Sequence, residues 1–212
     1  MVQDKELSGN KKIRIAVMVS GGGTNLQALI DAIADGRIEG AEIALVLSSR
    51  PDAYALTRAE RAGVSAVVVS KEEYPDPETR ADAILSALAA AGTDLVVMAG
   101  YMSILPNRVC SAYAGRMINI HPSLLPKYGG VGYYGLRVHE AVLKAGEKES
   151  GATVHYVDDL GVDHGEIILQ KRVPVLPGDT PETLQARVHE AEYKILVDAT
   201  NQIASELRKT KK

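Results

Sequence analysis

The chain has no tryptophan and no phenylalanine, and its nine tyrosines are scattered along 212 residues. Proteins that bind single-stranded nucleic acid stack the bases on aromatic side chains, and this sequence offers no such platform. Its 24 basic residues are outnumbered by 27 acidic ones, so the positive charge of a nucleic-acid binder is also missing. We therefore expect small-molecule partners and no nucleic acid.

Only one cysteine, Cys110, is present. An intramolecular disulfide and a zinc site of paired cysteines are therefore excluded, and the composition fits a reducing compartment. No histidine nearby in the sequence could activate the thiol, so Cys110 is interpreted as a packing residue. The polar first 12 residues lack the apolar core of a signal peptide, and no apolar run is long enough to span a membrane. These absences predict a cytoplasmic protein without membrane contact.

Strand-like apolar runs alternate with segments of helical periodicity, which predicts a mostly parallel sheet with helices on both faces. The predicted strands span residues 13–19, 42–47, 64–69, 94–98, 116–120, 152–157 and 167–175. The predicted helices span residues 55–62, 78–91, 109–113 and 136–145, and two more begin at Thr24 and Pro181. We expect a single α/β domain over residues 13–205, with a doubly wound, Rossmann-like sheet and an antiparallel C-terminal portion. A mobile N-terminal extension (1–12) and a basic C-terminal tail (206–212) would flank it.

Two polar residues end the strand expected at residues 116–120. Asn119 and His121 are two positions apart, so on an extended backbone their side chains point to the same face. Pro122 then stops strand pairing. An amide donor and an imidazole held together in this way suit a catalytic pair that stabilises an oxyanion. The alternative is a core histidine beside a turn-forming asparagine.

A glycine turn at residues 20–23 follows the first predicted strand, and Thr24 and Gln27 after it have the spacing of a helix capping box. Backbone N–H groups at a helix N-terminus suit a phosphate. Leu26 stands where a dinucleotide fingerprint has its third glycine, and the lysine of a Walker loop is missing. A monophosphate therefore fits better than a pyrophosphate or triphosphate. The alternative is a turn that binds no ligand.

Two other polar segments have ordinary explanations. The loop 158–165 contains three aspartates and is typical of a solvated turn. His155, Asp159 and Asp163 could be read as metal ligands, but they match no recognised ligand spacing, so no metal is expected. The polar residues of the last helix are explained by a solvated face: Gln185, Arg187, His189, Glu190, Glu192 and Lys194.

Four segments, at residues 19–28, 99–105, 119–126 and 151–165, stand in the order found in one enzyme family. With Gly-Gly-Thr-Asn at 22–25 and Asn-Ile-His-Pro-Ser-Leu-Leu-Pro at 119–126, the sequence resembles the folate-dependent phosphoribosylglycinamide formyltransferases. The second string is typical of folate formyl-transfer enzymes as a group, and the glycine turn narrows the resemblance to this branch. It covers roughly residues 13–200.

The resemblance implies transfer of a formyl group from the co-substrate 10-formyltetrahydrofolate to the amine of 5-phosphoribosylglycinamide, a step of de novo purine biosynthesis. The positions that match the family's catalytic residues are Asn119, His121 and Asp163. Those that would hold the phosphate-bearing substrate are Gly23, Thr24, Asn25 and Glu192. Those that would bind the folate are Arg80, Tyr101, Met102, Ser103, Ile104, Leu105 and Asn119, with the loop 157–163 against the pterin.

The chemistry of the residues fits these implied roles. When the amine attacks the formyl carbon, charge develops on the carbonyl oxygen, and donors aimed at it stabilise the transition state. Protonated His121 and the Asn119 amide would be those donors. The Asp163 carboxylate would favour the charged imidazole and accept a proton from the amine, directly or through water. No metal or covalent intermediate is required.

Three features depart from the family pattern. Ser103 stands where relatives commonly have arginine, and Tyr101 where phenylalanine is usual. Residues 127–135 lack the Pro-Gly and histidine residues of many relatives, and their four glycines predict a mobile loop that could close over the site.

Competing functions predict different sets of domains. Formyltetrahydrofolate hydrolase would add an N-terminal regulatory domain, and methionyl-tRNA formyltransferase a C-terminal nucleic-acid module, whereas this chain is expected to begin and end with the core domain. A non-catalytic phosphate-binding module and a dinucleotide-dependent oxidoreductase are the alternatives from other classes. Leu26 argues against the oxidoreductase. The expected assembly is a monomer or a homodimer.

Overall fold

The computed structural model describes residues 11–159 and 162–211, and most of the predicted N-terminal extension lies outside this part of the chain. Within it, the strands are β1 (Ile13–Val19), β2 (Ala41–Ser48), β3 (Ala66–Val68), β4 (Leu95–Met98), β5 (Met117–His121), β6 (Glu149–Tyr156) and β7 (Ile167–Pro174). The helices are α1 (Thr24–Ala34), α2 (Tyr54–Arg61), α3 (Pro77–Ala90), α4 (Asn107–Ala112), α5 (Leu136–Lys144) and α6 (Pro181–Thr210). Each predicted element is present, and the edge strand β3 is shorter than the predicted span 64–69.

The described strands form one sheet in the order β3-β2-β1-β4-β5-β6-β7. Strands β1 to β5 pair in parallel, and β6 and β7 add antiparallel pairs at one side. This confirms the predicted doubly wound sheet with an antiparallel C-terminal portion. The chain moves outward from β1 to β3 and then returns to β4 on the other side of β1. The carboxyl ends of β1 and β4 therefore flank a topological switch point, where ligands bind in open α/β sheets.

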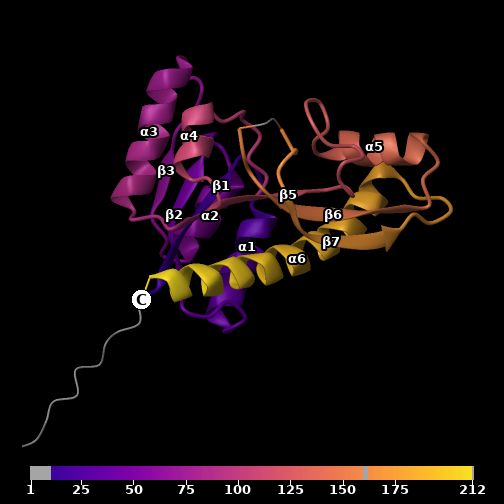
Figure 1. Cartoon of the computed structure of the whole chain (residues 1–212). Coiled ribbons are helices and arrows are strands. Elements are labelled where there is room, and N and C mark those ends of the chain that lie inside the picture. The colour runs from indigo at the N-terminus through magenta and orange to yellow at the C-terminus, as the bar shows by residue number, and fades with distance from the viewer. Residues whose placement is uncertain (1–10, 160–161, 212) are drawn as a thin grey trace, which may run out of the picture.

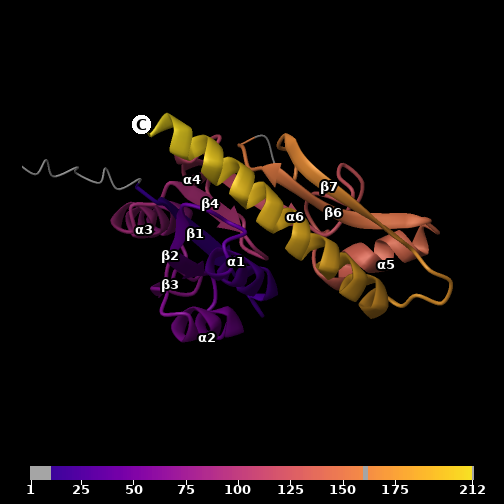
Figure 2. The same cartoon turned by 90° about the horizontal axis from the view of Figure 1, so that it is seen from below.

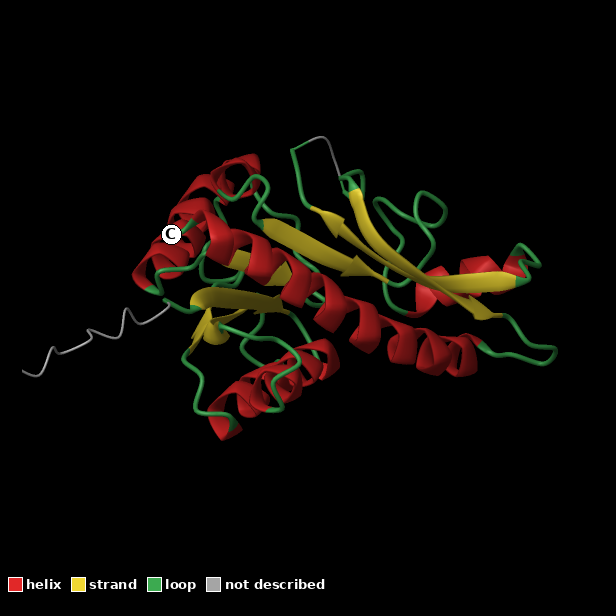
Figure 3. Ribbon diagram, turned by 60° about the horizontal axis from the view of Figure 1, so that its bottom comes forward, coloured by secondary structure: helices red, strands yellow, loops and turns green. Residues whose placement is uncertain are grey.

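Helices cover both faces of the sheet (Figure 1, Figure 3). Alternate residues of β1, such as Ile15 and Val17, join an apolar cluster with α1, α2 and α6. The intervening Ala16 and Met18 join a second cluster with α3 and α4. Because both faces of β1 are buried, its sequence is a continuous apolar run rather than an alternating one.

Helix α6 crosses the sheet diagonally beneath both its parallel and its antiparallel parts (Figure 2). Its first turn is closed by a capping box between Thr180 and Thr183, which fixes the start of the helix. The apolar stripe from Leu184 to Ala199 is buried, as the spacing of its residues predicts. No helix within the described ranges has the length and apolarity that crossing a membrane would require.

The C-terminal boundary differs from the prediction. The domain was expected to end at residue 205, but α6 continues to Thr210, and Lys211 forms an ion pair with Asp94. Ile203 and Leu207 pack against the core, which extends the helix beyond the last predicted apolar position. Residues 206–210 are thus part of α6 rather than a separate tail.

Candidate active site

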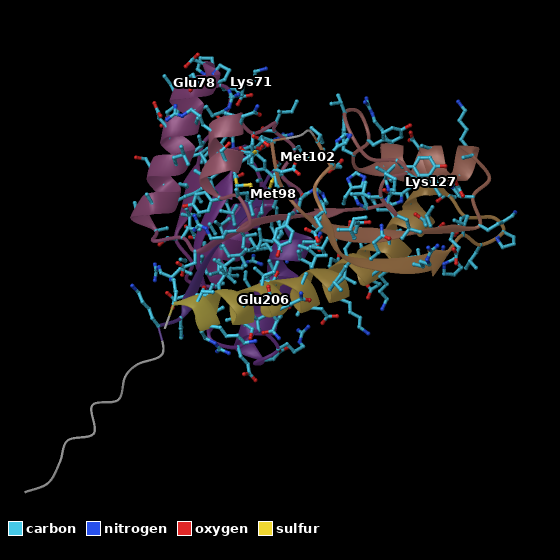
Figure 4. The ribbon with its side chains drawn as sticks, in the orientation of Figure 1. Lys71, Glu78, Met98, Met102, Lys127 and Glu206 are labelled. Carbon is cyan, nitrogen blue, oxygen red and sulfur yellow. The ribbon has the colours of Figure 1, made fainter. Side chains whose placement is uncertain are left out.

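A pocket of about 680 Å³ opens at the switch point of the sheet. Its walls come from the turn after β1 (21–25), the segment after β4 (98–105), the end of β5 and the loop 130–135. Met98 and Met102, which mark the β4 side, lie in the middle of the molecule between α4 and α5 (Figure 4). The volume is that of a small-molecule site.

The Asp163 carboxylate is the centre of a polar cluster in this pocket. One oxygen, Oδ2, lies 3.3 Å from His121 Nδ1 and accepts a hydrogen bond from the Gly130 N–H at 3.0 Å. The other, Oδ1, accepts from Asn119 Nδ2 at 3.3 Å and lies 3.5 Å from His155 Nε2. The structure therefore brings Asn119 and His121 into contact with Asp163, although Asp163 is 42 residues beyond His121 in the sequence.

Strand pairing explains why these groups meet. In the antiparallel pair of β5 and β6, Asn119 stands opposite His155 and His121 stands opposite Thr153. Side chains directly opposite one another on neighbouring strands lie on the same face and touch. The Thr153 hydroxyl donates to the Ser123 carbonyl at 2.6 Å and accepts from the Leu125 N–H at 3.1 Å, so β6 also holds the segment that follows His121.

Hydrogen-bond partners determine which ring nitrogens carry hydrogen. His121 Nε2 lies 2.8 Å from the Tyr128 carbonyl, and His155 Nδ1 lies 2.8 Å from the Tyr156 carbonyl. A carbonyl only accepts, so both of these nitrogens must donate. With its hydrogen on Nδ1, His155 accepts at Nε2 from Asn119 Nδ2, 3.1 Å away. Both hydrogens of the Asn119 amide therefore have acceptors inside the protein.

His121 and Asp163 influence each other's pKa. Burial lowers the pKa of His121, although the Asp163 charge opposes this. Burial raises the pKa of Asp163, but the contact with His155, the His121 charge and the Gly130 N–H together hold it below its ordinary value. Nδ1 of His121 and Oδ2 of Asp163 lie 3.3 Å apart, so the charge of each group acts directly on the other. The two groups therefore titrate as a unit.

The backbone at Asp163 is in the left-handed region, with φ of 62°. For a residue other than glycine this conformation costs of order 1–3 kcal/mol. Gly165, two residues on, is packed so closely that a Cβ atom would lie 1.8 Å from the Tyr156 carbonyl oxygen. The glycine lets the chain pass close to the end of β6 and present Asp163 to the cluster.

The glycine turn after β1 lies in the same pocket. Helix α1 begins at Thr24 as predicted, but the capping residue is Gly23 in a left-handed conformation, and no side chain caps the first turn. The expected capping box is absent because Gln27 instead bonds to Asp31 and Arg58. Uncapped N–H groups at a helix start are free to bind an anion.

Asn25 and Glu192 meet beside this turn. The Asn25 amide donates to Glu192 Oε2 at 3.2 Å, across 167 residues of sequence. Burial raises the pKa of Glu192 to about 7, although the bond from Asn25 opposes the shift. The Asn25 Oδ1 atom is buried and has no hydrogen-bond partner among the described residues.

His139, on α5, is the least satisfied polar side chain of the pocket wall. It is completely buried, and within the described chain neither ring nitrogen has a hydrogen-bond partner. Burial, with smaller contributions from the neighbouring His189 and His121, lowers its pKa to about 4. The ring is therefore neutral near pH 7.

The segment after β4 forms another wall of the pocket. The residues predicted to bind the folate here all line the pocket: Tyr101, Met102, Ser103, Ile104 and Leu105. Burial raises the pKa of Tyr101 to about 12, so its phenol stays protonated. Arg80 is not part of the wall: its guanidinium donates to the Tyr74 carbonyl at 2.9 Å.

The predicted loop 127–135 is tied to the catalytic cluster. The Tyr128 carbonyl accepts from His121, and the Gly130 N–H donates to Asp163. The side chains at the start of the loop point to another anchor. The Tyr128 hydroxyl donates to Glu147 at 2.9 Å, and Lys127 forms an ion pair with the same carboxylate. Residues 130–135 line the pocket, so any movement of this loop would alter the site.

Two further features concern the metal ligands weighed from the sequence and the single cysteine. In the described ranges, no three His, Cys, Asp or Glu side chains are grouped to hold a metal ion, and His155 instead serves the Asp163 cluster. Cys110 reaches the pocket wall, but burial raises the pKa of its thiol, which fits the packing interpretation.

Sequence reasoning missed part of the wall. His139 was not singled out, although a histidine between Val138 and Val142 on the apolar face of a helix was a usable signal. Gln185 and His189 were assigned to a solvated helix face, yet both line the pocket. Helical periodicity shows which residues share a face, and it cannot tell a face toward solvent from one toward a cavity.

A ligand-sized pocket at the switch point of a doubly wound sheet, with a carboxylate and an imidazole in contact inside it, defines an α/β enzyme. Comparison with known proteins then gives the family. Residues 13–200 match the Formyl transferase family model, and the chain belongs to that family. The resemblance inferred from the sequence motifs is confirmed.

Individual relatives agree with this assignment. The protein of Haemophilus influenzae named phosphoribosylglycinamide formyltransferase is 44% identical over 182 residues, which cover 86% of this chain and 82% of that protein. The trifunctional purine biosynthetic protein adenosine-3 of Drosophila melanogaster is 43% identical over 195 residues, and the chain spans 14% of that longer protein. The crystal structure of glycinamide ribonucleotide transformylase 1 from Symbiobacterium toebii has a TM-score of 0.87 and 43% identity, covering 96% of this chain and 92% of that one.

Proposed function

We propose that this protein transfers the formyl group of 10-formyltetrahydrofolate to the amine of 5-phosphoribosylglycinamide. The observation that carries the proposal is that the Asp163 cluster and the open glycine turn share one pocket. An acceptor with a phosphate at one end and an amine at the other can occupy both places at once. Names of the relatives support the same reaction.

Each part of the wall has a role in this proposal. The phosphate-bearing substrate is held by Gly23, Thr24, Asn25 and Glu192. The folate occupies the side formed by residues 101–105, with Asn119 between the two ligands and Arg80 outside the wall as a longer-range contact. The wall on this side is largely apolar, which suits a flat aromatic ring system.

The reaction forms a bond between the substrate nitrogen and the formyl carbon and breaks the bond from that carbon to the folate nitrogen. The amine loses a proton, and the folate nitrogen gains one. Asp163 is ionised near pH 7, because its pKa lies below the ordinary value, so it can accept the amine proton directly or through water. The proton that Asp163 accepts can then return to the leaving folate nitrogen, through His121 or through water.

Stabilising the oxyanion requires an exchange of hydrogen bonds. His121 Nε2 already donates to Tyr128, and Asn119 uses both hydrogens on Asp163 and His155. The developing oxygen must therefore replace at least one of these acceptors. Donors that are already oriented lose little energy in such an exchange, and hydrogen bonds often shorten only when substrate is bound.

A direct assay tests the proposal. The purified protein is mixed with 10-formyltetrahydrofolate and phosphoribosylglycinamide, and release of tetrahydrofolate is followed together with the mass of the acceptor. We expect an acceptor heavier by one formyl group, formed in step with tetrahydrofolate. Deformylation that proceeds equally well without the amine acceptor would contradict the proposal and indicate hydrolysis.

A further inference from the structure

The pocket wall contains no lysine and no arginine among the described residues. The substrate proposed above carries a phosphate, which has close to two negative charges near neutral pH. Buried anions in proteins are paired or strongly hydrogen-bonded, because desolvation is costly. A positive charge near the glycine turn must therefore come from behind the wall.

Arg58 on α2 occupies that position. Its Nε donates to the Gly22 carbonyl at 2.8 Å, and its Nη1 donates to Gln27 at 3.1 Å. The guanidinium carbon also lies 5.2 Å from the centre of the Tyr54 ring. Helix α2 packs directly on the turn, since a Cβ atom at Gly23 would lie 2.6 Å from Ala55 Cβ. Arg58 is thus held against the back of the turn by three separate contacts.

The charge of Arg58 is not neutralised by a carboxylate. Other arginines near the surface, such as Arg37 and Arg50, form ion pairs with an aspartate two residues away. In the described part of the chain Arg58 takes part in no ion pair, although its guanidinium is oriented. An unpaired, oriented cation raises the local potential for an anion.

The bond to Gly22 also acts through the peptide group itself. The Gly22 carbonyl and the Gly23 N–H belong to one peptide unit. A cation at the oxygen polarises this unit and strengthens its N–H as a donor, since hydrogen bonds in series reinforce one another. Gly23 belongs to the pocket wall, so the strengthened donor lies where an anion would bind.

A second observation, independent of Arg58, indicates a ligand site beside the glycine turn. Asn25 is 9% exposed and lines the pocket, and its Oδ1 atom has no hydrogen-bond partner among the described residues. A buried acceptor without a partner costs free energy that a bound donor relieves. The free protein therefore contains a site with unmet polar groups directly beside the turn that Arg58 supports.

We propose that Arg58 is a positioning residue for the substrate phosphate, acting through the Gly22–Gly23 peptide group and through its unpaired charge. This inference rests on the proposed function, because the phosphate comes from that substrate. Arg58 touches the turn and does not form part of the wall. It therefore sets affinity for the phosphate and leaves the chemistry at Asp163 unchanged.

Calorimetric binding to three ligands tests this role: phosphoribosylglycinamide, the same molecule without its phosphate, and inorganic phosphate. The variants are Arg58→Gln, Arg58→Lys and Arg61→Gln. Arg61 is the matched control, since it lies on the same helix beside the same Tyr54 ring, donates to the Tyr54 hydroxyl at 3.2 Å and has no bond to the turn. Thermal unfolding of each variant reports on folding.

For Arg58→Gln we expect affinity for both phosphate ligands to fall by about tenfold to a hundredfold, with less than about a threefold change for the dephosphorylated molecule. Arg58→Lys keeps the charge without the forked geometry, so it should lie between Arg58→Gln and the unaltered protein. Arg61→Gln should change phosphate affinity by less than about threefold. If Arg58→Gln fails to fold, the lysine variant carries the test.

Equal losses for the phosphorylated and dephosphorylated molecules would show a scaffold role and overturn the proposal. Equal losses in Arg58→Gln and Arg61→Gln would show an effect of overall charge and overturn it as well, as would failure of the unaltered protein to bind either phosphate ligand. Failure of the proposed function is seen separately, as absence of formyl transfer in a protein whose phosphate affinity still depends on Arg58.

Discussion

The two ends of the pocket differ in how their polar groups are satisfied. Around Asp163, the carboxylate oxygens, the Asn119 amide nitrogen and the ring nitrogens of His121 and His155 all have partners within the protein. Outside this cluster, the Asn25 amide oxygen and both ring nitrogens of His139 have none in the described chain. Similar polar side chains thus have their hydrogen-bond partners within the protein around Asp163 and lack some of them elsewhere in the pocket.

This difference indicates that the Asp163 cluster is preorganised for catalysis, whereas the groups without partners bind a ligand. A cluster whose members hold one another in place can face a developing charge without first rearranging, which is the main source of electrostatic catalysis. Buried groups without partners instead carry a desolvation cost that a ligand can remove. Changes at the Asp163 end should therefore act mainly on turnover, and changes at the Asn25 end mainly on affinity and stability.

The largest expected effect comes from Asp163→Asn. The change keeps the shape of the side chain but removes its charge, so the amine proton loses its acceptor and His121 loses its partner. We expect kcat to fall by about a hundredfold or more, with the affinity for phosphoribosylglycinamide within about threefold. Steady-state kinetics and calorimetry measure the two quantities, with the exposed Asp198→Asn as control. An unchanged kcat would remove the distinction between the two ends.

His139→Leu should flatten the dependence of stability on pH. The folded-state pKa of about 4 lies below the ordinary value of 6.5, so the unfolded chain binds more protons between these values. Stability is complete above pH 6.5 and is lost as the pH falls toward 4, by on the order of 3 kcal/mol from this group. Urea unfolding at a series of pH values should show this loss in the unaltered protein and in exposed Glu140→Gln, but not in His139→Leu. The same slope in all three would contradict the assignment.

Glu192→Gln tests the binding end by its pH dependence. With a pKa of about 7, the Glu192 carboxyl is mostly protonated at pH 6 and mostly ionised at pH 8. If the carboxylate accepts from the substrate, its contribution should strengthen affinity about tenfold between these values. Binding of phosphoribosylglycinamide should lose this component in Glu192→Gln and keep it in Glu190→Gln, an exposed position on the same helix. A loss of kcat at constant affinity would place Glu192 at the catalytic end instead.

The smallest effect is expected for Tyr128→Phe. The change removes the hydroxyl bond to Glu147 but keeps the backbone carbonyl that accepts from His121. The free energy of unfolding should fall by about 1 kcal/mol, and turnover should change only a few-fold. Chemical denaturation and the formyl-transfer assay test both. A loss of turnover as large as that of Asp163→Asn would show that the catalytic cluster depends on this side chain for its geometry.

Much of the fold could be predicted because its signals are local. The apolar run of β1 and the stripe of α6 follow from the periodicity of a few residues, and the spacing of Asn119 and His121 places both on one face of a strand. Errors occurred where distant contacts overruled a local pattern. Gly23 caps α1 in place of the expected Thr24 and Gln27 pair, since Gln27 accepts a hydrogen bond from Arg58 on another helix.

By itself the sequence determined the alternation of strands and helices, the glycine turn, and the amide and imidazole at the end of β5. These depend on neighbours a few residues apart, and their geometry is set by the repeat of a strand or helix. Only the tertiary structure decided that His155 faces Asn119, that Asp163 reaches His121, and that His139 and Glu192 enter the same pocket. Such contacts depend on helix packing and on strand register, and a shift of a strand by one residue turns each of its side chains to the opposite face.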